Sequence, residues 1–326
     1  MNDSVISWRT FGDDDQMTDL LKRITSVLSQ QVPLGLMVVG VTGNILSFVL
    51  LSQTQYRSSS TCLYMRALAV SDSCYLIFKI GRTVAIILFD SLVQSFIFCS
   101  GMFAVVHTFA SVSSILLAAM SLDRLIAVAV PLKAKILCSI RRARITIFAS
   151  LVVNILIYTT VNFFRQRRSY TKITQSCLYA LPGNLGSYYA HLRLIAVYYI
   201  PLGIMFVANV GIICVILRRQ GKTSKLHQQD DSGKKSKDGY ITVMLLTVSI
   251  SSFVFLFPNK AMNIYYSSVR GKLDPRSIVL RDMISSVTTL LLYCNYGMNF
   301  YAYTLPIAKF RTELLGLFCL VCTRRK

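Results

Sequence analysis

The sequence predicts an all-α membrane protein, a seven-transmembrane helix bundle with a short amphipathic eighth helix. Composition is the first reason, because 54% of the 326 residues are hydrophobic, 15% are charged and the mean hydropathy is +0.54. A soluble domain of this length would carry more charge. The second reason is the spacing of Cys99 and Arg124. A helix rises about 1.5 Å per residue, so the segment between them spans slightly more than a bilayer core of roughly 30 Å.

Seven segments are candidate spans, because each can supply the roughly 20 residues that a helix needs to cross a bilayer. Six of them contain no Asp, Glu, Lys or Arg, whereas the second is interrupted by Arg66, Asp72, Lys79 and Arg82. A single bundle is expected over residues 31–305, after an extracellular segment at 1–30. In chain order the spans fall within residues 24–56, 63–89, 91–122, 145–164, 194–217, 239–259 and 283–308.

Residues 306–326 are expected to form the amphipathic helix and a short cytoplasmic tail. Apolar residues recur there at helical spacing and form a face beyond the last span. Cys319 and Cys322 follow this face. Acylation of the two thiols would anchor the helix to the membrane, and free thiols are the alternative that the sequence leaves open.

The distribution of basic residues gives the orientation, since Lys and Arg are retained on the cytoplasmic side of membrane proteins. With the amino terminus outside, the inner segments hold more Lys and Arg than the outer ones, and more than half of the acids fall outside. We therefore expect a multi-pass protein of the plasma membrane. The net charge of +21 is ascribed mostly to inner loops that face anionic lipid, so no nucleic acid is needed to explain it.

Three features are expected on the outer side. Cys99 and Cys177 are the two cysteines that this topology places in an oxidising environment, so we expect a disulfide between them. Asn2 begins a sequon for N-glycosylation, Asn2-Asp3-Ser4. The long segment before Cys177 alternates in polarity at residues 171–174, which suggests a hairpin that forms a lid.

Short motifs follow one another on separate predicted helices. As a series they resemble the rhodopsin-like (class A) G-protein-coupled receptor family over nearly the whole chain. Segments 57–67, 131–135 and 141–144 are similar to invertebrate neuropeptide receptors of the FMRFamide-receptor-like group. The motifs are Gly43-Asn44, Leu68-Ala69-Val70-Ser71-Asp72, Asp123-Arg124-Leu125, Pro201, Phe257-Pro258 and Asn299-Phe300-Tyr301-Ala302-Tyr303.

The resemblance implies a receptor that binds an extracellular ligand, expected to be a neuropeptide, and activates a heterotrimeric G protein. Its switch is expected at Asp123 and Arg124, with Asp238 closing an ionic lock and with Asn299 and Tyr303 in the seventh-helix motif. The sequence departs from the family in parts of this switch. Leu256 replaces a tryptophan, Asn209 a tyrosine and Phe300 a proline, and the N–H of Phe300 lets a helical hydrogen bond form.

A buried acid in the second span is expensive unless it is paired or hydrated. In relatives this acid faces a polar set that holds a sodium ion in the resting state. The resemblance therefore implies an allosteric sodium site at Asp72, Ser113, Asn295 and Asn299, with Asn44 beside them. A water-filled polar core is the alternative, and no other cofactor is required.

Ligand chemistry follows from the outer half of the bundle. Val106 stands where amine receptors carry an aspartate, so a biogenic amine is not the expected ligand. No lysine occurs between residues 283 and 308 to bind retinal, so a photoreceptor is excluded. Lys79, Arg82 and Lys260 instead favour an anionic ligand group, although the first two could also snorkel to the interface. The expected ligand contacts are Lys79, Arg82, Val106, His107, Ala110, Leu256, Lys260, Asn263, Thr289 and Tyr293.

Other functions are weighed against a peptide receptor. A receptor for a carboxylate-bearing small molecule or lipid is the alternative within the family. A transporter or channel would show an internal repeat and helices broken in matching halves, and neither is found. An enzyme is not expected, because the three histidines are far apart and the catalytic motifs are lacking.

Overall fold

The computed structural model describes residues 16–53, 59–88, 96–163, 166–171, 176–180, 188, 192–193, 195–223, 232–268, 274–304, 311–312 and 314–316. Its elements in chain order are η1 (Val27–Gln31), α2 (Val32–Leu51), α3 (Ser60–Leu88), α5 (Phe96–Ala129), α6 (Pro131–Leu137), α7 (Ile140–Phe163), β1 (Gln166–Thr171), β2 (Ser176–Ala180), η3 (Ile195–Tyr199), α9 (Ile200–Thr223), α10 (Ser232–Ser268), α11 (Pro275–Gly297) and α12 (Asn299–Thr304).

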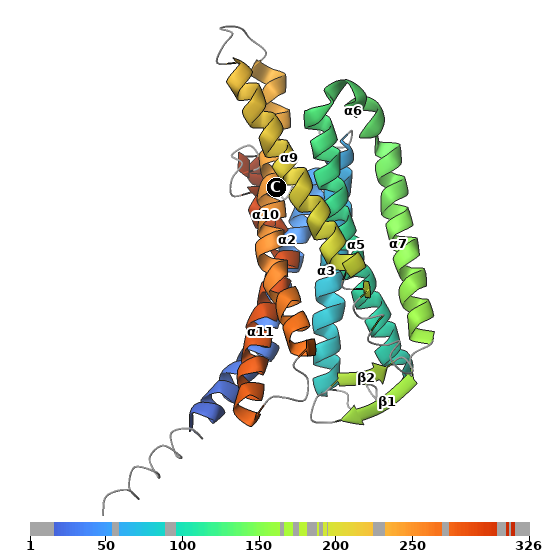
Figure 1. Ribbon diagram of the computed structural model, residues 1–326, viewed down its shortest axis with the longest axis vertical. Helices are drawn as coiled ribbons and strands as arrows, with labels where there is room; N and C mark the ends of the chain where they lie inside the picture. The colour runs from blue at the N-terminus through green and yellow to red at the C-terminus, as the bar shows by residue number, and fades with distance from the viewer. Residues whose placement is uncertain are drawn as a thin grey trace, which may run out of the picture.

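The long helices α2, α3, α5, α7, α9, α10 and α11 pack side by side as one bundle (Figure 1). Within the part of the chain that is described, five helical stretches are long and apolar enough to cross a membrane. They are Gln16–Leu51, Ser100–Ala129, Ile140–Thr160, Ile195–Arg218 and Ser277–Gly297. The first begins well before the expected start of the bundle at residue 31, because the chain is already helical from Gln16.

The segment that contains Cys177 forms a hairpin, as expected, although residues 172–174 of the alternating stretch lie outside the described residues. Strands β1 and β2 pair antiparallel, with Gln166 opposite Ala180 and Tyr170 opposite Cys177. The hairpin lies at one end of the bundle, and α6 lies at the other (Figure 1). We call these the hairpin end and the α6 end. The two strands are the one departure from a purely helical fold among the described residues.

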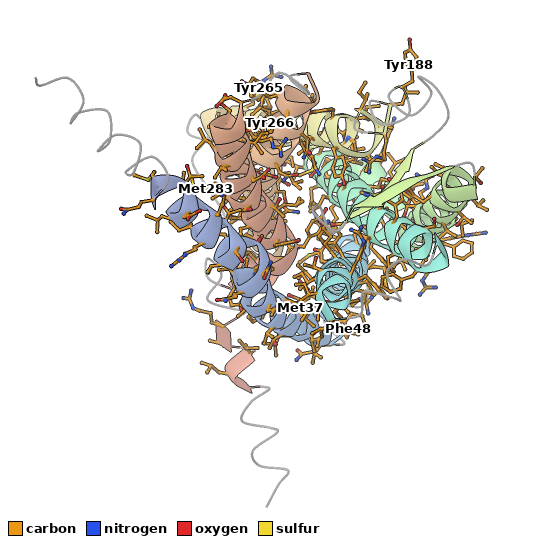
Figure 2. All side chains as sticks on the ribbon, turned by 90° about the horizontal axis from the view of Figure 1, so that it is seen from below. Met37, Phe48, Tyr188, Tyr265, Tyr266 and Met283 are labelled. Atoms are coloured by element: carbon orange, nitrogen blue, oxygen red, sulfur yellow. The ribbon has the colours of Figure 1, made fainter. Side chains whose placement is uncertain are left out.

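The bundle is filled by side chains and its periphery is apolar. Leu68, Leu76 and Leu116 are inaccessible to solvent and join α3 and α5 in a continuous core. Large apolar side chains such as Phe48 and Phe206 are exposed on the outside. Figure 2, which looks along the helices, places Met37 and Phe48 of α2 at the rim of the bundle. Such a surface suits lipid, since a water-soluble protein rarely exposes contiguous apolar area on this scale.

The last span is interrupted although it has no proline at residue 300. Helix α11 ends at Gly297, Met298 has φ −97° and ψ 0°, and α12 begins at Asn299. Next to this break, α2 and α11 touch through their backbones: a Cβ added at Gly40 would lie 2.8 Å from the Gly297 Cα. Phe300 is buried, and a Cβ at Gly43 would lie 3.2 Å from its own Cβ. The two glycines therefore let the first and last spans pack at close range.

The eighth helix stays a prediction. The structure describes only residues 311–312 and 314–316 of the tail, and these five are helical. Cys319 and Cys322 lie outside the described residues, as does Asn2.

Candidate functional site

The α6 end holds a buried network around Asp123 and Arg124, which lie near the end of α5. The Asp123 Oδ2 accepts hydrogen bonds from Ser60 Oγ at 2.8 Å and from Thr61 Oγ1 at 3.0 Å. Arg124 Nε donates to the same Thr61 Oγ1 at 2.8 Å, and Arg124 Nη2 also bonds to it. Thr61 thus bridges the carboxylate and the guanidinium of neighbouring residues. The start of α3 is thereby tied to the end of α5.

Sequence analysis missed Ser60 and Thr61. They lie in the run Ser58-Ser59-Ser60-Thr61, which precedes the apolar part of α3 and contains typical helix-start residues. That pattern gives no indication that two of the hydroxyls turn to another helix. Asp238 lies in α10 and Tyr303 in α12, but their side chains are not among those described. The ionic lock from Arg124 to Asp238 therefore stays a prediction.

Cys138 adds a thiol to this end of the bundle. It lies between α6 and α7, and its Sγ donates to the backbone oxygen of Asp123 at 3.3 Å. Burial, and then the nearby Asp123 carboxylate, raise the pKa of the Cys138 thiol to about 12. The thiol is therefore protonated at neutral pH and is a poor nucleophile.

Asp72 is fully buried in the middle of α3 and its carboxylate joins three helices. Its Oδ1 accepts from Ser113 Oγ of α5 at 2.6 Å, and its Oδ2 accepts from Asn299 Nδ2 of α12 at 2.5 Å. Asn44 Nδ2 of α2 donates to the Tyr296 carbonyl at 3.0 Å. Two of the expected contacts of Asp72 are therefore direct. Asn44 is held by the neighbouring backbone of α11 instead.

Several buried oxygens in this region have no hydrogen-bond partner among the described residues. They are Asn44 Oδ1, Ser47 Oγ and Asn295 Oδ1, and Asn295 lies one helical turn before Asn299. Buried polar atoms are normally satisfied by protein, water or an ion. Oxygen donors of the carboxylate, hydroxyl and amide types are those that hard cations prefer. The residues present therefore fit a small cation such as sodium chemically.

Toward the hairpin end, four basic side chains form what we call the cation cluster: Lys79, Arg82, Arg193 and Lys260. The positive charges of Arg82 and Lys260 both lie close enough to repel that of Lys79, and the charge of Arg193 likewise repels that of Lys260. Lys260 is only 6% exposed, and its Nζ lies 3.7 Å from the ring centroid of Tyr198. Lys79 and Lys260, which were expected to converge from the sequence, do so.

His107 is held by Arg193, which was not among the expected ligand contacts. Arg193 Nη1 lies 3.0 Å from His107 Nδ1 and 3.2 Å from Nε2. The imidazole also stacks on Tyr158, at 5.7 Å between ring centroids, and Tyr158 hydrogen-bonds Ser111 at 2.7 Å. His107 is therefore a packed imidazole that positions a charged neighbour.

Of the other expected ligand contacts, some are buried in the bundle, and Asn263 and Thr289 are hydrogen-bonded to a residue of α10. Val106, Ala110, Leu256 and Tyr293 are buried. Asn259, which was not expected, donates to Thr289 Oγ1 at 3.3 Å and accepts from Asn263 Nδ2 at its backbone and side-chain oxygens. Cys99 lies in α5 and Cys177 in β2, but their side chains are not described, so the disulfide stays a prediction.

Fold and sites together define a multi-pass membrane protein of the receptor type, with a buried acid at mid-bundle and an Asp-Arg pair at one end. Residues 43–303 match the family described as 7 transmembrane receptor (rhodopsin family), and the chain belongs to this family. The resemblance that the motifs indicated is thus confirmed. Membership also removes the transporter or channel alternative.

Similar proteins include receptors named for peptides. The chain is 24% identical to the thyrotropin-releasing hormone receptor of Bos taurus over 340 residues, which covers 94% of this chain and 83% of that receptor. It is 28% identical to the FMRFamide receptor of Drosophila melanogaster, covering 86% of this chain and 52% of that protein. The FMRFamide peptide receptor frpr-18 of Caenorhabditis elegans is 26% identical, with coverage of 86% and 66%.

Proposed function

We propose that the chain is a plasma-membrane receptor that binds an extracellular neuropeptide and activates a heterotrimeric G protein. The observation that carries the proposal is the similarity, over most of the chain, to receptors whose names specify peptides. A lid at the hairpin end agrees with a ligand that enters from that side.

The proposed orientation puts the hairpin end outside and the α6 end in the cytoplasm. Basic residues near α6 support it: Lys133, Arg141, Arg142 and Arg144 all carry exposed side chains there. Positive charge next to a span is retained on the cytoplasmic side. The amino terminus, which precedes α2, is then extracellular.

The proposed switch is release of Arg124. In the structure its guanidinium is held by Thr61, whose hydroxyl also satisfies Asp123. A G protein that enters at the α6 end would need this guanidinium and the surface around it. Ligand binding at the opposite end would favour the arrangement in which α3 and α5 separate enough to free Arg124, because a ligand shifts a conformational equilibrium only by binding one state better.

We further propose that Asp72 binds sodium in the resting state. Ser113 and Asn299 would orient the carboxylate, and Asn295 would supply an amide oxygen that has no protein partner among the described residues. The ion would supply positive charge to a carboxylate buried among apolar helices. A water-filled polar core without an ion is the alternative.

The test of the main proposal is a peptide screen in cells that express the chain with a promiscuous G protein. Thyrotropin-releasing hormone, FMRFamide and a library of amidated peptides are applied, and calcium release is recorded. A peptide that acts at submicromolar concentration in expressing cells, and not in cells with an Arg124→Ala variant at equal surface expression, supports the proposal. A response confined to lipids or small carboxylates would replace it with the alternative receptor type.

A further inference from the structure

The charge balance of the cation cluster is unusual because none of the acidic side chains that the structure describes pairs with its members. The structure describes the side chains of five acidic residues, and each is engaged elsewhere: Asp19 with Lys22, Asp72 with Ser113 and Asn299, Asp123 with Ser60 and Thr61, Asp274 with Ser277, and Asp282 with Arg281. Among the described residues no carboxylate forms an ion pair with Lys79, Arg82, Arg193 or Lys260.

Snorkelling does not account for the buried members. A snorkelling lysine keeps its ammonium in water or headgroups. Lys260 instead places its Nζ over the face of Tyr198, inside the bundle, and the residue is 6% exposed. Arg82 has a buried Nε with no partner among the described residues. The Lys260 ammonium is therefore poorly hydrated, and its charge repels that of Lys79.

An uncompensated buried charge destabilises a protein, so a cluster of them indicates a function that needs the charge. The geometry also leaves the cluster reachable, since Lys79, Arg82 and Arg193 are only half-buried. Tyr198 and Tyr293 add phenolic groups beside it, and Tyr293 interacts electrostatically with Arg82. Ammonium, guanidinium and phenol are all hydrogen-bond donors, and a guanidinium binds planar oxyanions through two parallel bonds.

We infer that the cation cluster is a recognition site for an anionic group of the ligand, a carboxylate or a sulfate, held between Lys79 and Lys260 with Arg82 and Arg193 beside them. This inference rests on the proposed function, whose ligand it narrows to an acidic peptide. A ligand whose cationic group entered the same site would be repelled by all four residues.

The first experiment uses paired synthetic peptides. Each amidated peptide that contains Asp, Glu or sulfotyrosine is matched with one in which Asn, Gln or tyrosine replaces it, and both are tested with a promiscuous G protein. We expect the acidic members to be at least tenfold more potent. The Lys79→Met, Lys260→Met double variant should lose this preference, whereas the exposed Lys22→Met control should keep it.

The outcomes separate this inference from the proposed function. If neutral or basic peptides activate the receptor and the double variant responds normally, the acidic-ligand inference is overturned and the peptide receptor stands. If no peptide acts but small dicarboxylates do, through Lys79 and Lys260, the inference stands and the peptide proposal fails.

A second experiment needs no ligand and decides the case in which nothing activates the receptor. The melting temperature of the purified, ligand-free protein is compared with that of Lys260→Met, which keeps a side chain of similar length and replaces the cation–π contact with Tyr198 by a sulfur–aromatic one. Removal of a buried charge that has no acidic partner among the described residues should raise the melting temperature. Lys22→Met should not change it. A melting temperature equal to or below that of the wild type would show that Lys260 serves the fold, and would overturn the inference.

Discussion

At the scale of single residues, the sites depend on hydroxyl groups that connect charged residues. The Thr61 hydroxyl accepts from Arg124 and donates to Asp123, and the Ser113 hydroxyl donates to Asp72. Hydrogen bonds to charged groups contribute about 1.5–3 kcal/mol each. A methyl group in place of one hydroxyl is therefore enough to shift an equilibrium between two receptor conformations by roughly tenfold.

Thr61→Val should raise basal signalling several-fold at equal surface expression. The substitution keeps the shape of the side chain but removes one acceptor of Arg124 and one donor to Asp123, so the guanidinium is held less tightly in the absence of ligand. Basal G-protein activation in transfected cells measures the effect. Thr42→Val is the matched control, because Thr42 Oγ1 donates only to the Val38 carbonyl of its own helix. Equal basal activity of both variants would contradict a restraining role for Thr61.

Asp72→Asn should remove the sodium dependence of agonist binding. With the wild type, agonist affinity is expected to rise when sodium is replaced by N-methyl-D-glucamine, since sodium stabilises the resting state. The amide cannot neutralise a cation, so affinity in the variant should be the same in both buffers. Radioligand competition measures this once an agonist is known. A wild-type receptor indifferent to sodium would leave the water-filled core as the explanation of Asp72.

At the scale of helices, close packing depends on glycines where spans cross. Gly40 and Gly297 bring α2 and α11 into backbone contact, and Gly43 faces Phe300. The sequence marked Gly43 through its motif but gave no signal for the Gly40 contact, because a glycine pattern on one helix does not identify the partner helix. The interruption at Met298 was also unexpected, since replacing proline by Phe300 was expected to favour a continuous helix.

Gly40→Ala should lower the melting temperature and the surface expression of the receptor. The added Cβ would meet the Gly297 Cα at 2.8 Å, closer than such contacts ever come, so the two helices must separate. Gly35→Ala on the same helix is the control, because nothing lies within 4 Å of its added Cβ. At that position a gain of helix propensity should leave the protein at least as stable. Equal stability of the two variants would contradict direct backbone packing.

At the scale of the whole molecule, the fold was predictable because the membrane restricts the choices. Backbone groups in lipid must be satisfied within a helix or a closed barrel, so long apolar segments identify the spans. The motifs then matched these segments to successive helices of the receptor family, and residues 43–303 match the model of that family. The cation cluster was only partly predictable. Lys79 and Lys260 follow from helical spacing, whereas Arg193 joins them because the chain before η3 folds toward α5, which no periodic pattern encodes.

The proposed orientation predicts that the two ends of the chain lie on opposite sides of the membrane. An epitope tag at the amino terminus should be accessible to antibody on intact cells, and one at the carboxyl terminus only after permeabilisation. Seven spans are an odd number and require this result. An Asn2→Gln variant should lose a glycan detectable by glycosidase treatment if the sequon is used. Both tags on one side would be incompatible with the assigned topology.

The contact between Gly40 and Gly297 has a mechanical consequence for the last span. A proline imposes a bend through its ring wherever the helix goes, so the bend is permanent. Here the break between α11 and α12 at Met298 lies beside a backbone contact with another helix instead. A displacement of α2 would therefore reach the Gly297 backbone directly, next to the residue at which α12 begins.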